Sequence, residues 1–267
     1  VQEVGNIYPK YYLKAFYDGM TAEGDTMPIS LIRSAWAGSA KYGALVWSGD
    51  IVSTFECFRR QVQAGLNMAI AGIPWWTTDI GGFHGARTDD PDFHRLYIRW
   101  FEYGCFCPVM RLHGNRNPQE GYGAEQIGSG SDNEIWSFGD KAYEISKKYI
   151  FLRERLRDYI RTQMKKAHED GTPMMRPVFY DFPTDQESWN VEDAYLFGPD
   201  LYVAPVMEDH VTEREVYLPD GTAWFNAWTG EKYEGGQNVT VAAPLDTIPV
   251  FVKEGADAEK LLNIFSE

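Results

Sequence analysis

Asp50 is the first residue of this 267-residue sequence whose surroundings favour acid–base chemistry. It closes the tetrapeptide Trp-Ser-Gly-Asp at residues 47–50, directly after an apolar run. A carboxyl group beside apolar neighbours holds its proton more readily, which suits a general acid. From these four residues alone, however, a strand-end Asp that caps the following helix is the favoured interpretation.

Asp79 is the second candidate carboxylate, in the stretch Thr-Thr-Asp-Ile-Gly-Gly-Phe at residues 77–83. It could bind a hydroxyl group or take part in catalysis. A strand-to-helix turn explains the same residues equally well, because Gly81 and Gly82 let the backbone turn sharply.

Other side chains could hold a sugar between such carboxylates. Arg33 could clamp a carboxylate or a hydroxyl, and His113 could donate a hydrogen bond. Trp47, Trp75, Trp76 and Phe83 could form a stacking wall, although some of them must belong to the core. Each also has a structural interpretation, as an ion pair, a core His or a core aromatic residue. Taken as a set, paired carboxylates with a guanidinium, an imidazole and aromatic rings favour glycoside hydrolysis.

The segments that must position these residues alternate between apolar runs and amphipathic stretches. Strands are expected at 28–34, 44–50, 69–82 and 107–114, and helices at 8–20, 53–68, 91–104 and 132–169. We expect Ser53 to cap the second helix, with Glu56 completing a capping box. Alternation of this kind predicts a parallel sheet.

The candidate residues lie at the C-terminal ends of the expected strands, where a (β/α)8 barrel has its active site. Arg33, Asp50, Asp79 and His113 stand at the C-terminal ends of the four expected strands. In a (β/α)8 barrel the active site lies on that face. Four strands cannot close such a barrel, so we expect four more ahead of Val1.

The pattern changes near residue 172, where short apolar runs alternate with Gly- and Pro-containing turns. We therefore predict an α/β plus all-β chain with two domains. Residues 1–171 form the C-terminal half of a (β/α)8 barrel, about strands five to eight, and residues 172–267 form a small antiparallel β-sandwich.

Composition restricts the partners. The formal charge of −14 argues against nucleic acid and against an anionic membrane surface, and no apolar run is long enough to span a bilayer. Cys57, Cys105 and Cys107 form neither a disulfide framework nor a metal-ligand set. They indicate a reducing compartment, so we expect a cytoplasmic protein.

Longer stretches of the sequence resemble glycoside hydrolase family 31. They are residues 31–51, 64–83 and 106–114, followed by 171–183, 195–206 and 228–237. The resemblance implies a retaining, exo-acting α-glycosidase that acts on terminal α-linked xylose or glucose in oligosaccharides, without a metal or organic cofactor.

The resemblance also implies a role for each candidate residue. Asp50 is implied to be the acid/base, and Arg33 and His113 to bind the sugar before the cleaved bond. Asp79 is implied to support Arg33 or the sugar. Trp47 and Phe83 are implied to line the same subsite.

One departure from the family pattern is large, because no Asp-x-x-Glu nucleophile motif precedes Asp50. Asp18 lies on an expected helix and does not suit the role. We therefore expect the nucleophile on a missing N-terminal half of the same enzyme, upstream of Val1.

Two alternatives remain open at this stage. A catalytically incomplete fragment would act only as a carbohydrate-binding or structural half. A phosphate-handling barrel isomerase would need a Gly-rich phosphate cradle. Residues 80–85 are Gly-rich, but their aromatic neighbours and the acidic charge argue against phosphate. Assembly into a homo-oligomer is also left open.

Overall fold

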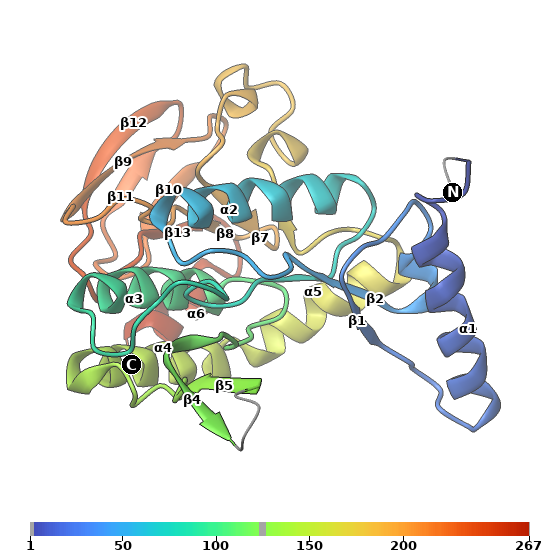
Figure 1. Cartoon of the computed structure of the whole chain (residues 1–267). Coiled ribbons are helices and arrows are strands. Elements are labelled where there is room, and N and C mark those ends of the chain that lie inside the picture. The colour runs from blue at the N-terminus through green and yellow to red at the C-terminus, as the bar shows by residue number, and fades with distance from the viewer. Residues whose placement is uncertain (1–2, 123–126, 267) are drawn as a thin grey trace.

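The computed structural model of the protein describes residues 3–122 and 127–266 (Figure 1). Helices and strands alternate through its first part. They are α1 (Tyr8–Ala22), β1 (Ser30–Ile32), η1 (Ala40–Tyr42), β2 (Ala44–Trp47), α2 (Phe55–Ile70), β3 (Trp76–Thr77), α3 (Pro91–Cys105), β4 (Arg116–Tyr122), β5 (Ile127–Ser131), α4 (Gly139–Arg155) and α5 (Arg157–Glu169). None of the helices described is long and apolar enough to cross a membrane.

The predicted parallel sheet is present in the order β1-β2-β3. Ser30 pairs with Ala44, and Val46 pairs with Trp76, both in parallel register. Val46 and Trp76 are buried, whereas Leu45 and Trp47 of β2 are half-buried and Leu31 of β1 is exposed, so the burial of the sheet falls from β3 toward β1.

Residues 107–114 do not form the predicted fourth strand. They still run beside β3, because the Val109 amide donates to the Trp76 carbonyl at 3.2 Å and the Ile80 amide donates to the Arg111 carbonyl at 3.3 Å. Two such bonds hold the segment in the next position of the sheet but do not make a continuous ladder.

Two details of the predicted helices are also corrected. The residue that caps α2 is Thr54, whose hydroxyl accepts from the Cys57 amide at 3.1 Å. The Ser53 amide instead donates to the His84 carbonyl at 2.8 Å. The single helix expected at 132–169 is α4 and α5, which meet at the buried Leu156. The hairpin β4–β5 was not predicted.

The second part of the chain is built mainly of antiparallel strands. Its elements are β6 (Met175–Arg176), η2 (Val178–Tyr180), η3 (Glu187–Trp189), β7 (Tyr195–Phe197), β8 (Leu201–Val203), β9 (Glu213–Leu218), β10 (Ala223–Asn226), β11 (Lys232–Glu234), β12 (Gln237–Ala242), β13 (Val250–Lys253) and α6 (Ala258–Ser266). One six-stranded sheet has the order β11-β10-β13-β8-β7-β6, and β9 and β12 form a separate ribbon. The helix α6 was not predicted.

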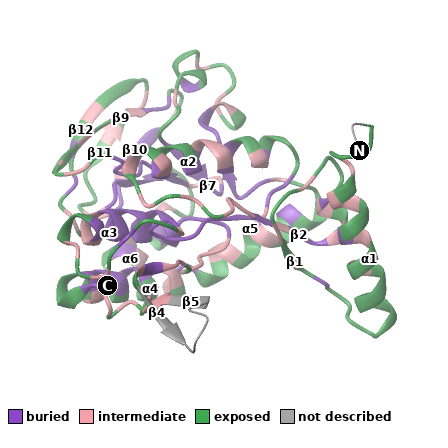
Figure 2. Ribbon diagram, in the orientation of Figure 1, coloured by how far each residue is buried: buried purple, intermediate pink, exposed green. Residues whose placement is uncertain are grey.

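Apart from the exposed edge strand β11, the six-stranded sheet is largely buried on both faces (Figure 2), and its alternating residues belong to two different cores. Tyr195, Leu201 and Val250 pack in the core that also contains Trp100 and Phe106 of the first part. Their neighbours in sequence face the ribbon; these are Leu196, Tyr202 and Phe251, packed with Val216, Leu218 and Val241. The predicted sandwich is therefore a six-stranded sheet with a two-stranded ribbon on one face and helices on the other.

A buried polar cluster joins α3 to the second part of the chain. Arg99 donates to the carbonyls of Ala243 at 2.7 Å and Pro244 at 3.0 Å. Glu102 accepts from Arg99 at 3.1 Å and from the Tyr149 hydroxyl at 3.2 Å. Burial raises the pKa of Glu102 to about 8, although Arg99 and Tyr149 oppose the rise.

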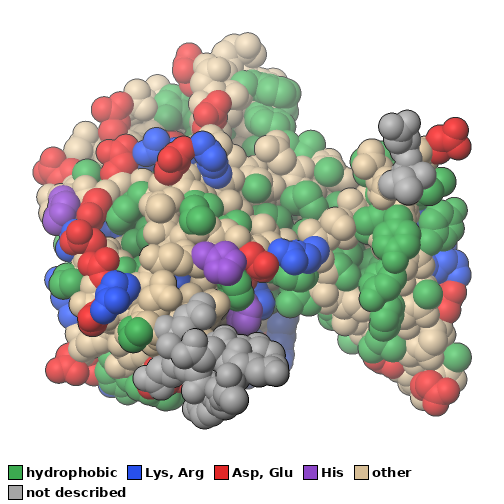
Figure 3. All heavy atoms as spheres, viewed as in Figure 1, with side chains coloured by type: hydrophobic (Ala, Val, Ile, Leu, Met, Phe, Trp, Pro, Cys, Tyr) green, Lys and Arg blue, Asp and Glu red, His purple; other side chains and the backbone are tan. Residues whose placement is uncertain are grey.

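One apolar surface is exposed on α1 and β1. Tyr8, Tyr12, Phe16 and Met20 follow each other at a spacing of four residues, and the rings of Tyr12 and Phe16 lie 5.0 Å apart. Leu31 is exposed as well, and its strand, β1, lies at the edge of the sheet beside β2. Figure 3 shows the hydrophobic band over the lobe that carries α1. Apolar surface beside an open strand edge is typical of an interface.

Substitution Glu102→Gln is expected to reduce the pH dependence of stability. The folded protein holds the Glu102 proton up to about pH 8, whereas the unfolded chain releases it near the ordinary value of 4.5. The folded state therefore binds more protons in this window, so its stability falls as the pH rises through it. Thermal unfolding between pH 5 and pH 8 should show a smaller fall in Tm for the variant, and an unchanged fall would contradict this role for Glu102.

The 267-residue polypeptide alone is expected to self-associate through the α1–β1 surface. The double substitution Tyr12→Lys and Phe16→Lys should shift the polypeptide toward monomer, because it places charge in that surface. Phe151→Lys is the control, since Phe151 is equally exposed but lies on α4. Light scattering after size exclusion gives the mass; a monomeric parent polypeptide would disprove the expectation.

Candidate active site

Arg33, Trp47 and Asp50 form one group at the C-terminal ends of β1 and β2. Arg33 Nη2 lies 2.9 Å from Asp50 Oδ2, and these side chains are 61% and 41% exposed. The Arg33 guanidinium carbon lies 5.8 Å from the centre of the Trp47 ring. The group thus offers a carboxylate, a cation and an aromatic face to a ligand from solvent.

Phe83 and His113 form a second group, from the loops that follow β3 and residues 109–111. Their ring centres lie 5.3 Å apart. The Phe83 amide donates to the carbonyl of Ile51 at 2.7 Å, and its carbonyl accepts from the Asn115 amide at 2.8 Å. Because Ile51 directly follows Asp50, the backbone of one loop positions Phe83 relative to the carboxylate.

Asp79 is placed differently from Asp50, because its side chain is fully buried. It forms an ion pair with Arg111, not with Arg33. Burial raises the pKa of Asp79, while Arg111 and His113 oppose the rise and Asp50 adds to it. A buried, paired carboxylate of this kind supports other side chains better than it attacks a substrate.

Arg111 is the site residue that the sequence interpretation missed. Its guanidinium carbon lies 5.9 Å from the centre of the Trp47 ring, so Trp47 is close to Arg111 as well as Arg33. A signal was present, since Arg111 stands two positions before His113 and alternate residues of an extended segment share a face.

A shallow cavity of about 460 Å³ opens beside Arg33 and Trp47. Tyr8 and Tyr12 of α1 and Leu31 of β1 line its other side. The candidate site therefore continues into the exposed apolar surface of α1.

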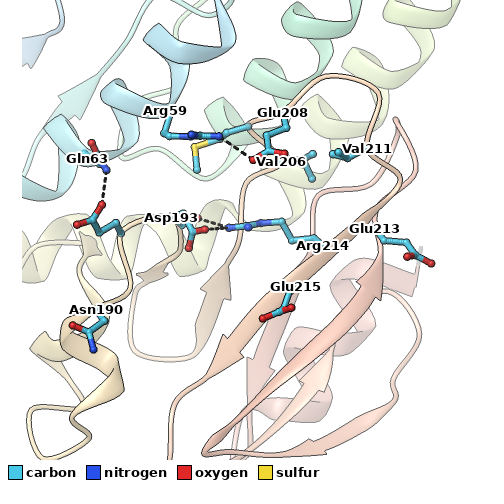
Figure 4. Close-up of a pocket in the computed structure, with 12 residues that line it drawn as sticks. Arg59, Gln63, Asn190, Asp193, Val206, Glu208, Val211, Glu213, Arg214 and Glu215 are labelled. Atoms are coloured by element: carbon cyan, nitrogen blue, oxygen red, sulfur yellow. Dashed lines mark hydrogen bonds and ion pairs between the residues drawn. The ribbon is translucent and has the colours of Figure 1, made fainter.

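A second cavity, of about 500 Å³, lies at the junction of α2 with the second part of the chain (Figure 4). Polar pairs cross it: Arg59 with Glu208 at 3.0 Å, Gln63 with Glu192 at 3.2 Å and Arg214 with Asp193 at 2.9 Å. None of the predicted site residues lines this cavity. The first two pairs join α2 to the second part of the chain, and the third lies within the second part.

The part of the chain that the structure describes contains no cluster of side chains that could bind a metal ion. No group of three or more His, Cys, Asp or Glu side chains there is arranged to hold an ion.

Comparison with known families gives two matches that together cover nearly the whole chain. Residues 1–163 match the glycosyl hydrolases family 31 TIM-barrel domain, and residues 171–256 match the glycosyl hydrolase family 31 C-terminal domain.

Individual relatives agree with these matches. An α-xylosidase of Saccharolobus solfataricus is 38% identical over 94% of this chain and 32% of its own length. Alpha-xylosidase A of Aspergillus niger is 37% identical over 93% of this chain and 37% of its own length. A crystal structure of a GH31 α-xylosidase from a soil metagenome, complexed with xylose, is 54% identical with a TM-score of 0.94, over 97% of this chain and 39% of that one. The chain spans roughly a third of the length of these relatives.

Substitution Arg111→Met is expected to lower the free energy of unfolding by about 3 kcal/mol, because it leaves the buried Asp79 without its partner. Adding Asp79→Asn in the same protein should recover part of this loss. Urea unfolding of both single variants and the double variant measures the coupling. Strictly additive losses would mean that the ion pair does not link these two side chains.

Proposed function

Because the chain belongs to glycosyl hydrolase family 31, we propose that it forms part of a retaining, exo-acting α-glycosidase that cleaves terminal α-linked xylose or glucose from oligosaccharides. The observation that carries the proposal is the partly exposed pair of Asp50 and Arg33 beside Trp47 at adjoining strand ends. That arrangement combines a proton-transferring carboxylate with groups that bind and orient a sugar.

Asp50 is proposed as the acid/base. It would first protonate the oxygen of the leaving group while a carboxylate nucleophile attacks the anomeric carbon. The ionised Asp50 would then take a proton from the water that releases the sugar from the covalent intermediate. In retaining enzymes the two carboxyl groups stand about 5–5.5 Å apart.

The nucleophile is proposed to come from a part of the enzyme outside this sequence. Asp79 is unsuited to the role because it is buried and paired with Arg111. The chain covers roughly a third of its relatives' length, which leaves room for a partner segment that carries the second carboxylate.

The remaining predicted residues are proposed to bind the sugar. Arg33 and His113 would hold its hydroxyl groups, and Trp47 and Phe83 would line the subsite. Asp79 would act indirectly, by holding Arg111 against Trp47.

Xylose is the first substrate to test. The soil-metagenome protein is an α-xylosidase complexed with xylose, and the relatives from S. solfataricus and A. niger are α-xylosidases. Glucose is the second candidate, because the Bacillus thermoamyloliquefaciens relative, 34% identical over 96% of this chain, is alpha-glucosidase 2.

The architecture of the proposal follows the two matched domains. We propose that residues 1–171 supply about strands five to eight of the barrel and residues 172–267 the C-terminal domain. Cys57, Cys105 and Cys107 are free thiols, which supports the expected cytoplasmic location.

A second candidate function is a carbohydrate-binding half without catalysis. Asp50 is the exposed carboxylate of the predicted set and Asp79 is buried, so the polypeptide alone would bind xylose or glucose and release no product. An intact mass, followed by assays with 4-nitrophenyl α-xyloside and α-glucoside, separates the two functions. Turnover by material of 30.5 kDa would contradict an external nucleophile.

Substitution Asp50→Ala in the full-length enzyme should slow substrates with poor leaving groups most, by about a hundredfold or more, since these need protonation. Activated aryl glycosides should lose less. A series of aryl α-glycosides of increasing leaving-group pKa measures the difference in kcat/KM. Equal slowing across the series would count against the acid role.

A further inference from the structure

Arg116 is a fully buried residue three positions after His113, at the start of β4. Its Nη1 donates to the Gly82 carbonyl at 2.8 Å, and its Nη2 donates to the Ile80 carbonyl at 3.1 Å. Its Nε donates to Asn133 Oδ1 at 2.8 Å. The guanidinium also lies over the Phe93 ring, 4.7 Å from its centre. A single planar group thus holds two backbone carbonyls of one turn.

The turn needs these donors because of its backbone conformation. Gly81 and Gly82 have φ angles of 84° and 78°, in the left-handed region that favours glycine. Two such residues in succession form a turn beyond the end of β3 at Thr77, and the carbonyls of Ile80 and Gly82 accept from Arg116 inside the protein. No other group in the described part of the chain donates to these two carbonyls, so without the guanidinium they would lack a donor there, which a folded protein avoids.

The turn that Arg116 holds connects two proposed sugar-site residues. Asp79 lies at its start, where its carbonyl accepts from the Gly82 amide at 2.9 Å, and Phe83 lies at its end. Arg116 Nη1 also lies 3.4 Å from the Ser53 hydroxyl, in the segment that follows Asp50. One side chain therefore contacts the loops that carry Asp50, Asp79 and Phe83.

The guanidinium of Arg116 packs closely against two glycines, Gly81 and Gly114, where a larger side chain would collide with it. A Cβ atom at Gly114 would lie 2.5 Å from the Arg116 Cζ, and one at Gly81 would lie 3.1 Å from Nη2. Burial lowers the pKa of Arg116 to about 10, so the group stays charged at neutral pH. A lysine ammonium in this slot would be a compact charge without the fork that reaches both carbonyls.

We propose that Arg116 is a positioning residue for the sugar subsite, which fixes the turn at residues 80–83 and thereby the places of Asp79 and Phe83. The proposal rests on the proposed function, because it assigns the consequence to sugar binding. Arg116 itself does not touch the substrate.

The test compares Arg116→Lys with Arg153→Lys in the full-length enzyme. Arg153 is the control, because it also donates to backbone carbonyls, those of Cys105, Cys107 and Pro108. These carbonyls precede residues 109–111 in the chain, whereas the candidate site follows those residues. Both variants should lose thermal stability. Only Arg116→Lys should raise the inhibition constants of xylose and glucose and the KM, by about tenfold or more, with a smaller change in kcat.

Hydrogen exchange gives a second measurement that does not depend on turnover. The amides of residues 80–84 should exchange faster in Arg116→Lys and at the parent rate in Arg153→Lys. Asn133→Ala is the milder variant if Arg116→Lys does not fold, since it removes the Nε acceptor alone. It should raise the inhibition constants in the same direction by a smaller factor.

The outcomes separate this inference from the proposed function. Equal changes in sugar inhibition for Arg116→Lys and Arg153→Lys, or none in either, would overturn the positioning role. A parent enzyme that neither binds nor cleaves the two sugars would overturn the proposed function instead. In that case unchanged exchange at residues 80–84 would overturn the claim that Arg116 holds the turn.

Discussion

The candidate site depends on hydrogen bonds that continue the strand contacts past the ends of the strands. The carbonyl of Ile51 accepts from the amides of both Phe83 and His84, at 2.7 and 2.9 Å. The Phe83 carbonyl in turn accepts from Asn115. Each bond lies within two residues of a proposed site side chain, so the loops after β2, β3 and residues 109–111 form one connected frame. Side chains on such a frame keep their separation even though several of them are exposed to solvent.

Two parts of this site could be predicted from sequence, because they depend on local pattern. Apolar runs that end in Arg33 and Asp50 place these residues at the ends of β1 and β2, and the alternation with helices places the strand ends on one face. His113 also follows such a run, but residues 107–114 lie beside β3 without forming a strand. The choice of ion-pair partners could not be predicted in this way. Whether Asp79 meets Arg33 or Arg111 depends on the rotamers of long side chains and on the exact path of residues 109–111, which no residue pattern specifies.

The errors in the predicted fold have similar physical causes. Thr54 caps α2 in place of Ser53, and Ser53 is instead engaged by contacts distant in sequence, through its amide with the His84 carbonyl and through its hydroxyl with Arg116. The division of 132–169 at Leu156 follows no glycine or proline, and helical hydrogen bonds continue on both sides of it, from Leu156 to Leu152 and from Ile160 to Leu156. Tertiary packing, and not local propensity, decides such details.

The order of strands in the six-stranded sheet bears on how the protein is made. β13 (Val250–Lys253) is the last strand in sequence, yet it lies between β10 and β8 in the middle of the sheet. Until it leaves the ribosome, β8 and β10 each present an unpaired edge, and the inner face of the sheet cannot complete the core it shares with α3. Strands translated earlier must therefore be kept from pairing wrongly until residues 250–253 have emerged.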